Sequence, residues 1–224
     1  MKLRVKFSKT GVLKYIGHLD TMRYFQKAFR RTDIRVKYST GFSPHMIMSF
    51  AQALGVGVES LGEYFDVEVE DDQEIAGMVD KLNAQMAEGF KVIDIVKIDD
   101  KATNAMASVA ASRYEIDFYK TENPVTPEVI DEFKAAGPIE YTKKVKTGEI
   151  TFNIKNFVFE LEYREKGFYC VVDSSSAGNL KPKFLVEVLL KLAGKDIEQY
   201  PFHILRIDLL KRDSEGRLVS LDHE

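Results

Sequence analysis

The order of alternating segments and amphipathic helices in the first 98 residues most limits what this chain can fold into. Apolar and charged residues alternate over 3–7 and again over 65–69, as they do in half-buried strands. Between and after them, the pattern predicts a helix over 18–32, a short strand near 47–51, a helix over 73–86 and a strand over 92–98. This β-α-β-β-α-β order is that of a ferredoxin-like unit.

The second half of the chain shows a similar order. Alternation returns near 114–118 and 150–154, a hairpin is predicted over 157–172, and helices are predicted over 126–136 and from Pro182 onward, before a last strand at 203–209. We therefore predict an α+β protein of two tandem ferredoxin-like (βαββαβ) units with mostly antiparallel sheets. The first would cover 1–99, a linker rich in Ala and Ser would cover 100–112, and the second, with an extra hairpin, would cover 113–224.

Composition excludes several classes of protein. Hydrophobic residues make up 45% of the 224 residues, which excludes low-complexity disorder. No apolar run approaches the roughly 18 residues of a membrane span, and the N-terminus does not resemble a signal peptide, so we expect a cytoplasmic protein without a membrane. Cys170 is the one cysteine, which excludes a disulfide framework and a Cys-rich metal site. We expect no cofactor and no metal.

Charge is segregated along the chain although the formal net charge is only −3. Residues 1–45 hold eleven basic and two acidic residues, whereas 46–100 hold thirteen acids and three lysines. Such asymmetry indicates either a polyanion-binding face or two segments that neutralise each other. Neutralisation is expected in part, because the first and third strands would be antiparallel neighbours. Their outward faces carry opposite charges: Lys2, Arg4 and Lys6 against Asp66, Glu68 and Glu70.

The predicted helix over 18–32 carries basic residues on its polar face. Asp20 can offset Arg23, but no acid on the helix stands near the cations that follow. These are Lys27, Arg30 and Arg31, continued along the chain by Arg35 and Lys37. Three interpretations stay open: a solvated face with salt bridges to other segments, a surface for phosphate or nucleic acid, and a docking surface for an acidic protein.

The loop that follows the helix has an unusual composition, Ser39-Thr40-Gly41-Phe42-Ser43-Pro44-His45. Small residues, hydroxyls and free N–H groups suit an anion. His18 and His45 can titrate near neutral pH, and with Asp20, Glu59 or Glu63 they would form an acid–base pocket. The plainer interpretation is that Gly41 and Pro44 only shape the loop.

A set of motifs in this region resembles one family. They are Phe7-x-Lys9-x-Gly11, Gly17-His18-Leu19-Asp20-x-x-Arg23, Arg30-Arg31, Tyr38-Ser39-x-Gly41-Phe42-x-Pro44-His45, Ser49-Phe50-Ala51, Gly55-Val56-Gly57-Val58-Glu59-Ser60 and Glu63-Tyr64-x-Asp66. The chain resembles the radical SAM-linked family, a domain of unknown function (DUF2344), densely over 3–70 and more loosely afterwards. The resemblance implies a separate radical SAM protein as partner. It implies no catalytic residues, and this chain lacks the three cysteines that would ligate a radical SAM cluster.

The sequence thus predicts an accessory protein for a radical SAM enzyme that binds RNA or another anionic substrate and has no catalytic activity of its own. The predicted contacts are Arg23, Lys27, Arg30, Arg31, Arg35, Lys37, Ser39, Gly41, Ser43 and His45. The predicted motif pocket consists of His18, Asp20, Phe42, Pro44, Glu59 and Glu63. Two alternatives remain, a stand-alone enzyme that uses His18, Asp20, His45 and Glu63 on a small anionic substrate, and a protein–protein adaptor.

Overall fold

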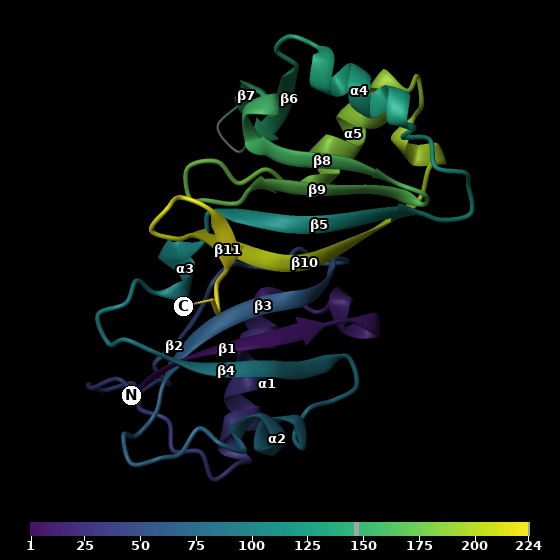
Figure 1. Cartoon of the computed structure of the whole chain (residues 1–224). Helices are drawn as coiled ribbons and strands as arrows, with labels where there is room; N and C mark the ends of the chain where they lie inside the picture. Colours follow the sequence, from purple (N-terminus) through teal and green to yellow (C-terminus); the bar gives the residue numbers. More distant parts are fainter. Residues whose placement is uncertain (146–147, 224) are drawn as a thin grey trace. The chain divides into compact units, whose positions relative to one another are not determined.

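The computed structural model describes residues 1–145 and 148–223, which divide into two compact units (Figure 1). Unit 1 consists of Met1–Val109 with Asp208–Glu224, and unit 2 of Ala110–Ile207. The predicted α+β class with mostly antiparallel sheets is confirmed. The predicted division into 1–99, 100–112 and 113–224 differs in two places. The expected linker holds helix α3 (Ala105–Ser108) with Ala105 buried, and the C-terminal segment returns to unit 1.

Unit 1 has the predicted β-α-β-β-α-β order. Its elements are β1 (Lys2–Lys9), the 3-10 helix η1 (Gly11–Tyr15), α1 (His18–Arg30), β2 (Met48–Phe50), β3 (Glu59–Glu68), α2 (Met78–Asn83) and β4 (Phe90–Ile98). Strand β1 lies between β4 and β3, β2 pairs with β3, and every pair is antiparallel. Helix α2 is shorter than the predicted 73–86, because Gly77 precedes it with a φ of +80°, a left-handed conformation that a helix does not continue through.

One face of the β1–β3 ladder forms the core of unit 1. Leu3, Val5 and Phe7 lie on it with Phe65, Val67 and Val69, as the alternation predicts. Helix α1 adds Phe25, whose ring centroid lies 4.6 Å from that of Phe7, 5.0 Å from that of Phe65 and 5.4 Å from that of Phe90. Figure 1 shows α1 and α2 below these strands. This packing directs the polar face of α1 to solvent.

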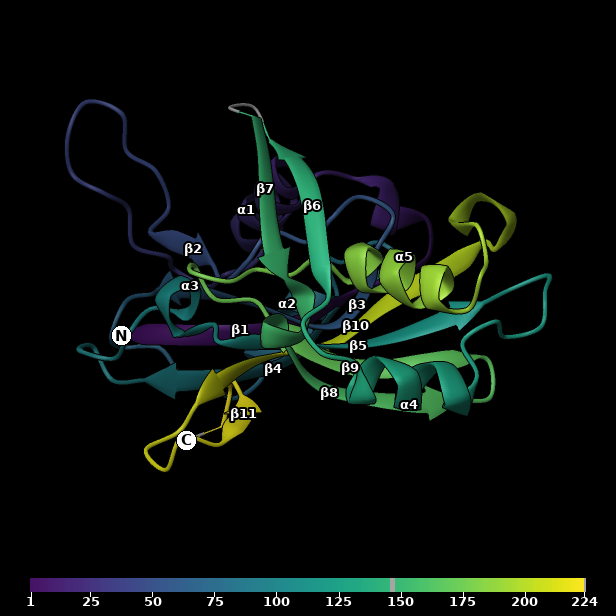
Figure 2. The same cartoon turned by 90° about the horizontal axis from the view of Figure 1, so that it is seen from above.

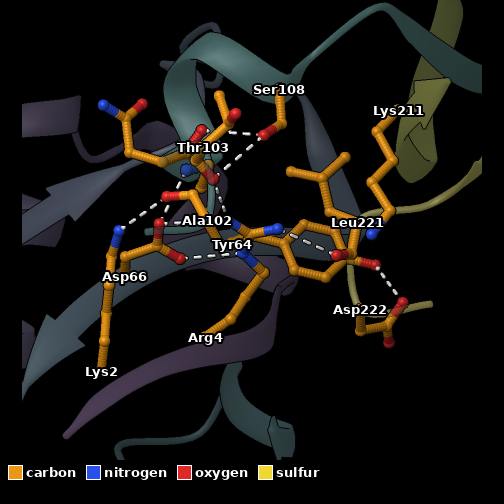
Figure 3. Close-up of polar contacts among 12 residues, drawn as sticks. Lys2, Arg4, Tyr64, Asp66, Ala102, Thr103, Ser108, Lys211, Leu221 and Asp222 are labelled. Atoms are coloured by element: carbon orange, nitrogen blue, oxygen red, sulfur yellow. Dashed lines mark hydrogen bonds and ion pairs between the residues drawn. The ribbon is translucent and has the colours of Figure 1, made fainter. Parts of the chain in front are cut away.

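The opposite face of the ladder carries the charges that the sequence predicts to meet. The register pairs Lys2 with Glu68 and Arg4 with Asp66. Arg4 and Asp66 form a bidentate ion pair, with Nε–Oδ1 at 2.8 Å and Nη2–Oδ2 at 3.1 Å, and each side chain is only 4% exposed. Arg4 also donates to the carbonyls of Thr103 and Leu221 (Figure 3). The part of the face around Arg4 and Asp66 is therefore closed to solvent.

The C-terminal segment closes this face beside Lys6. The ammonium of Lys6 lies 3.3 Å from Asp208 and 3.1 Å from Asp222. Tyr64, which is 1% exposed, donates to Asp208 at 2.6 Å. Burial and the two carboxylates raise the pKa of the Tyr64 hydroxyl. Because every buried charge here has a partner, the segment is held by matched polar groups as well as by the burial of Leu209 and Leu221.

In unit 2, strand β9 lies between β5 and β8, and both pairs are antiparallel. Its elements are β5 (Ala111–Phe118), α4 (Pro127–Ala135), β6 (Glu140–Val145), β7 (Gly148–Asn153), the 3-10 helix η2 (Ile154–Phe157), β8 (Val158–Arg164), β9 (Gly167–Asp173), α5 (Pro182–Leu192) and the 3-10 helix η3 (Ile197–Gln199). Strand β10 (Phe202–Arg212) begins in unit 2 and ends in unit 1, where it pairs with β11 (Leu218–Ser220). Strands β8 and β9 form the hairpin predicted over 157–172. Strands β6 and β7 form a further hairpin that the sequence did not predict, a separate ribbon that is drawn clearly in Figure 2.

The core of unit 2 gathers on β5, β9 and α5. Ile116, Phe168, Leu185 and Leu189 are fully buried there, and Cys170 is buried with them as the alternation around it predicts. Burial raises the pKa of the Cys170 thiol, so this cysteine is suited to packing rather than to reaction. That each unit is a complete ferredoxin-like fold stays a prediction.

Alanine substitution of one buried and one exposed phenylalanine tests the packing of the core of unit 1. Replacing Phe25, which is 0% exposed, by alanine should lower the free energy of unfolding by about 3–5 kcal/mol, because it opens a cavity among five neighbouring aromatic rings. The same change at Phe42, which is fully exposed, should alter it by less than about 0.5 kcal/mol. Chemical denaturation of the two variants measures both values. Equal losses would contradict the packing of α1.

Candidate functional site

Three cations form a row on the solvent side of α1. Arg23, Lys27 and Arg30, here called the α1 row, follow one another at i, i+4 and i+7 and are all exposed. Asp20 lies 3.5 Å from Arg23, but both side chains are about two-thirds exposed, at 66% and 67%, so water screens the pair strongly. Within the described part of the chain, Lys27 and Arg30 form no ion pair. The row therefore keeps most of its positive charge.

The other predicted basic contacts already have partners. Arg35 pairs with Asp72, and Lys37 lies 3.1 Å from Asp71, whose hydrogen bond raises the pKa of the lysine. Arg31 donates to the carbonyl of Gln85 at 3.2 Å. For Arg35 and Lys37, pairing with acids of a neighbouring segment is the interpretation that the structure supports. Among these basic residues, the charge that no acid neutralises lies on the α1 row and at Arg31, whose partner is an uncharged carbonyl.

The 39–45 loop is closed at its base by Ser39 and His45. The amide of Ser39 donates to the carbonyl of His45 at 2.9 Å, the amide of His45 donates to Oγ of Ser39 at 3.1 Å, and Nδ1 of His45 lies 2.8 Å from the same oxygen. Gly41 adopts a φ of +111°, which favours glycine, and Phe42 and Pro44 are exposed. Figure 2 shows the connection from α1 to β2 as a long projecting loop. Anion binding by Gly41 and Ser43 stays a prediction, with Ser39 and His45 already bonded to each other.

A groove lies beside β2 and the end of β3. This β2 groove has a volume of about 390 Å³. Its lining includes Lys2, Ser39, His45, Met46, Ile47, Met48, Ser49, Asp66, Val67, Glu68 and Asn104. No residue of the α1 row lines this groove. The sequence predicts one patch of the 39–45 loop and the basic helix, whereas Ser39 and His45, at the base of this loop, line the groove.

The four residues of the acid–base hypothesis are distributed over several places. His18 and Glu63 line one small cavity with Lys9, but its volume is about 10 Å³, which suits a single water molecule. Asp20 faces Arg23, and His45 lines the β2 groove. Glu59 accepts a hydrogen bond from the amide of Gly11. His18 and His45 therefore line different cavities, and the cavity at His18 has no room for a substrate.

Two properties of the described residues bear on the class of site. They contain no group of three or more His, Cys, Asp or Glu side chains arranged to hold a metal ion. None of their helices has both the length and the apolar character needed to span a bilayer.

Sequence reasoning missed two side chains that stand out in the structure. Lys9 is 2% exposed and donates from Nζ to the carbonyl of Ile16 at 2.7 Å. Glu68 lines the β2 groove, although the pattern grouped it with Asp66 as a partner for strand β1. The only signal for Lys9 is its place in the Phe7-x-Lys9-x-Gly11 motif, and no signal separates Glu68 from Asp66.

The titration of Lys9 tests whether its ammonium is buried in the small cavity that His18 and Glu63 line. Desolvation lowers the pKa of the Lys9 ammonium below the ordinary 10.5, and the carboxylate of Glu63 opposes that shift. NMR titration of the Lys9 side chain should give a pKa below 10.5, and a still lower one in Glu63→Gln. Because the unfolded chain then binds the proton more tightly, stability should rise with pH between the folded and unfolded values. A pKa above 10.5, or a rise in Glu63→Gln, would contradict the geometry.

Comparison with known proteins gives one family. A search of curated proteins finds no match. A family model described as "Uncharacterized protein conserved in bacteria (DUF2344)" matches residues 2–182, which include the whole of α1, the 39–45 loop and the β2 groove. Since the match extends over most of the chain, the protein belongs to this family of bacterial proteins (DUF2344).

Proposed function

We propose that this protein is a non-catalytic RNA-binding module that acts in the cytoplasm together with a separate radical SAM enzyme. The α1 row is the single observation that carries the RNA part of the proposal. RNA binding without sequence preference depends on cations that reach phosphates, and their contribution depends on salt. Lys27 and Arg30 supply such cations because they form no ion pair within the described residues.

The helix dipole explains the presence of only some of the cations in the α1 row. Cations in the last turn of a helix stabilise its C-terminal end, and Lys27 and Arg30 lie in that turn of α1. Arg23 lies nearer the middle, where the dipole gives a cation little. From Arg23 to Arg30 the row extends over about 10 Å of helix. A stabilised helix end therefore does not explain a row of this length.

The proposal of a radical SAM partner rests on the family resemblance alone. The one cysteine of the chain, Cys170, is buried, so this chain offers no three-cysteine site for the iron–sulfur cluster of such an enzyme. In our proposal the radical chemistry takes place on the partner chain, and this chain holds the RNA.

A protein–protein adaptor is the second candidate. Three exposed apolar side chains favour it, because they lie in η1 and at the start of α1, just before the α1 row: Val12 at 78%, Tyr15 at 66% and Leu19 at 58% exposure. Such a group of exposed apolar residues is typical of protein interfaces. A stand-alone enzyme has less support, because the cavity at His18 is too small for a substrate.

Charge reversal of the α1 row tests the RNA proposal. Arg23→Glu, Lys27→Glu and Arg30→Glu together should weaken binding of total tRNA by about ten-fold or more in gel shifts at low salt, because each lost phosphate contact lowers affinity. A matched control reverses three exposed lysines of unit 2, Lys134, Lys166 and Lys195, and should bind as the wild type does.

Two results would contradict the proposal. One is no detectable binding of tRNA or rRNA by the wild type at low salt, and the other is equal loss in both triple variants. Co-purification of a radical SAM protein that survives nuclease and high salt, with no RNA binding, would support the adaptor instead.

A further inference from the structure

An exposed apolar surface lies where η1 leads into α1. In a 3-10 helix, side chains three residues apart share one face. Leu13 and Ile16 pack against the core of unit 1, and this directs Val12 and Tyr15 to solvent, where both are largely exposed. Leu19, in the first turn of α1, is largely exposed as well. These three apolar side chains are therefore open to a ligand instead of being used in the core.

The 55–57 loop and Lys14 complete this surface. The amide of Gly57 donates to the carbonyl of Lys14 at 2.9 Å, which places Val56, 65% exposed, beside η1. The ammonium of Lys14 lies 5.5 Å from the centroid of the Tyr15 ring, a distance typical of a cation–π contact. The exposed apolar side chains of this surface, here called the η1 patch, are Val12, Tyr15, Leu19 and Val56.

The η1 patch leads directly into the α1 row. Leu19 and Arg23 are four residues apart in α1, so their side chains are neighbours on its surface. Tyr15 precedes Leu19 by four residues, which separates their Cα atoms by no more than about 14 Å. Glu59 and Asp20 have partners of their own, since Glu59 accepts a backbone hydrogen bond and Asp20 lies 3.5 Å from Arg23. An apolar surface and a row of cations are thus offered side by side.

We propose that the η1 patch and the α1 row together bind single-stranded RNA, with unpaired bases on the patch and phosphates on the row. A single strand presents both chemistries, because its bases have open faces that stack on aromatic rings such as that of Tyr15. A duplex hides these faces in its own stack and offers the protein mainly its backbone. This inference rests on the proposed function and names the form of RNA that is bound.

Other occupants match only part of this surface. An apolar protein surface would cover the patch but would leave the cations of the α1 row without anions. A second copy of the chain would bring a second row of cations near the first, and like charges across an interface oppose association. The RNA proposed for the row supplies bases to the patch without any further partner.

The affinity for one RNA in two forms tests the inference. The whole chain is titrated at low salt into a labelled strand of about 12 nucleotides without internal pairing, and into the duplex of that strand, with fluorescence anisotropy as the readout. The wild type should bind the single strand about five-fold more tightly than the duplex or better. Tyr15→Ala should weaken binding of the single strand by about ten-fold and that of the duplex by less than about two-fold, because the ring acts by stacking. Tyr15→Phe keeps the ring and should bind as the wild type does.

Tyr119 provides a matched control. It is an exposed tyrosine of unit 2, at 48%, and the ammonium of Lys120 lies 5.9 Å from its ring centroid. Tyr119→Ala should bind both forms of RNA as the wild type does. The inference is overturned by equal affinity of the wild type for the two forms, by unchanged binding of the single strand in Tyr15→Ala, or by equal losses in the two alanine variants.

The outcomes distinguish failure of the inference from failure of the proposed function. Loss of RNA binding on charge reversal of the α1 row, together with equal affinity for single strand and duplex, overturns only the inference. A wild type that binds neither form overturns the proposed function and the inference with it. Co-purification of a radical SAM protein that Tyr15→Ala abolishes, with no RNA binding, identifies the η1 patch as a protein interface and overturns both.

Discussion

The ion pair between Arg4 and Asp66 is the contact on which unit 1 depends. Both side chains are almost fully buried, and an unpaired charge at either place would cost several kcal/mol. The remaining hydrogen-bonding groups of the pair reach the carbonyls of Thr103 and Leu221 and the amide of Ala105. One pair thus holds β1, β3, the start of α3 and the C-terminal segment in a single register. It also closes one face of the sheet and leaves the other for α1.

This arrangement decides which charges of the basic N-terminal segment are available. Arg4 and Lys6 are neutralised by buried carboxylates, and Arg35 and Lys37 by acids that follow β3. The α1 row keeps its charge because its helix packs through the opposite, aromatic face. A net charge of −3 therefore coexists with a local surface suited to a polyanion.

Periodicity predicted the order of the strands and helices of unit 1, and the opposite charges predicted that β1 and β3 share a face. The closure of that face was not predictable, because Asp208 and Asp222 look like ordinary polar residues more than 200 positions after Lys6. Alternation also could not distinguish Asp66, which is buried in an ion pair with Arg4, from Glu68, which is only half-buried two residues later. Among the site residues, the α1 row followed from helical spacing. The position of His45 could not be predicted, because it depends on how the long connection from α1 to β2 folds, and the spacing of residues along the sequence does not determine that.

The salt dependence of RNA affinity tests the central claim, that the α1 row supplies the free charge, most directly. The slope of log K against log salt reports how many phosphates are neutralised, about 0.7 for each contact with a single strand. If the α1 row supplies the free charge, Arg23→Gln, Lys27→Gln and Arg30→Gln should each reduce the slope by about that amount. Lys37→Gln, at a lysine already paired with Asp71, should leave the slope unchanged. Equal slopes in all four variants, or a fall confined to Lys37→Gln, would contradict it.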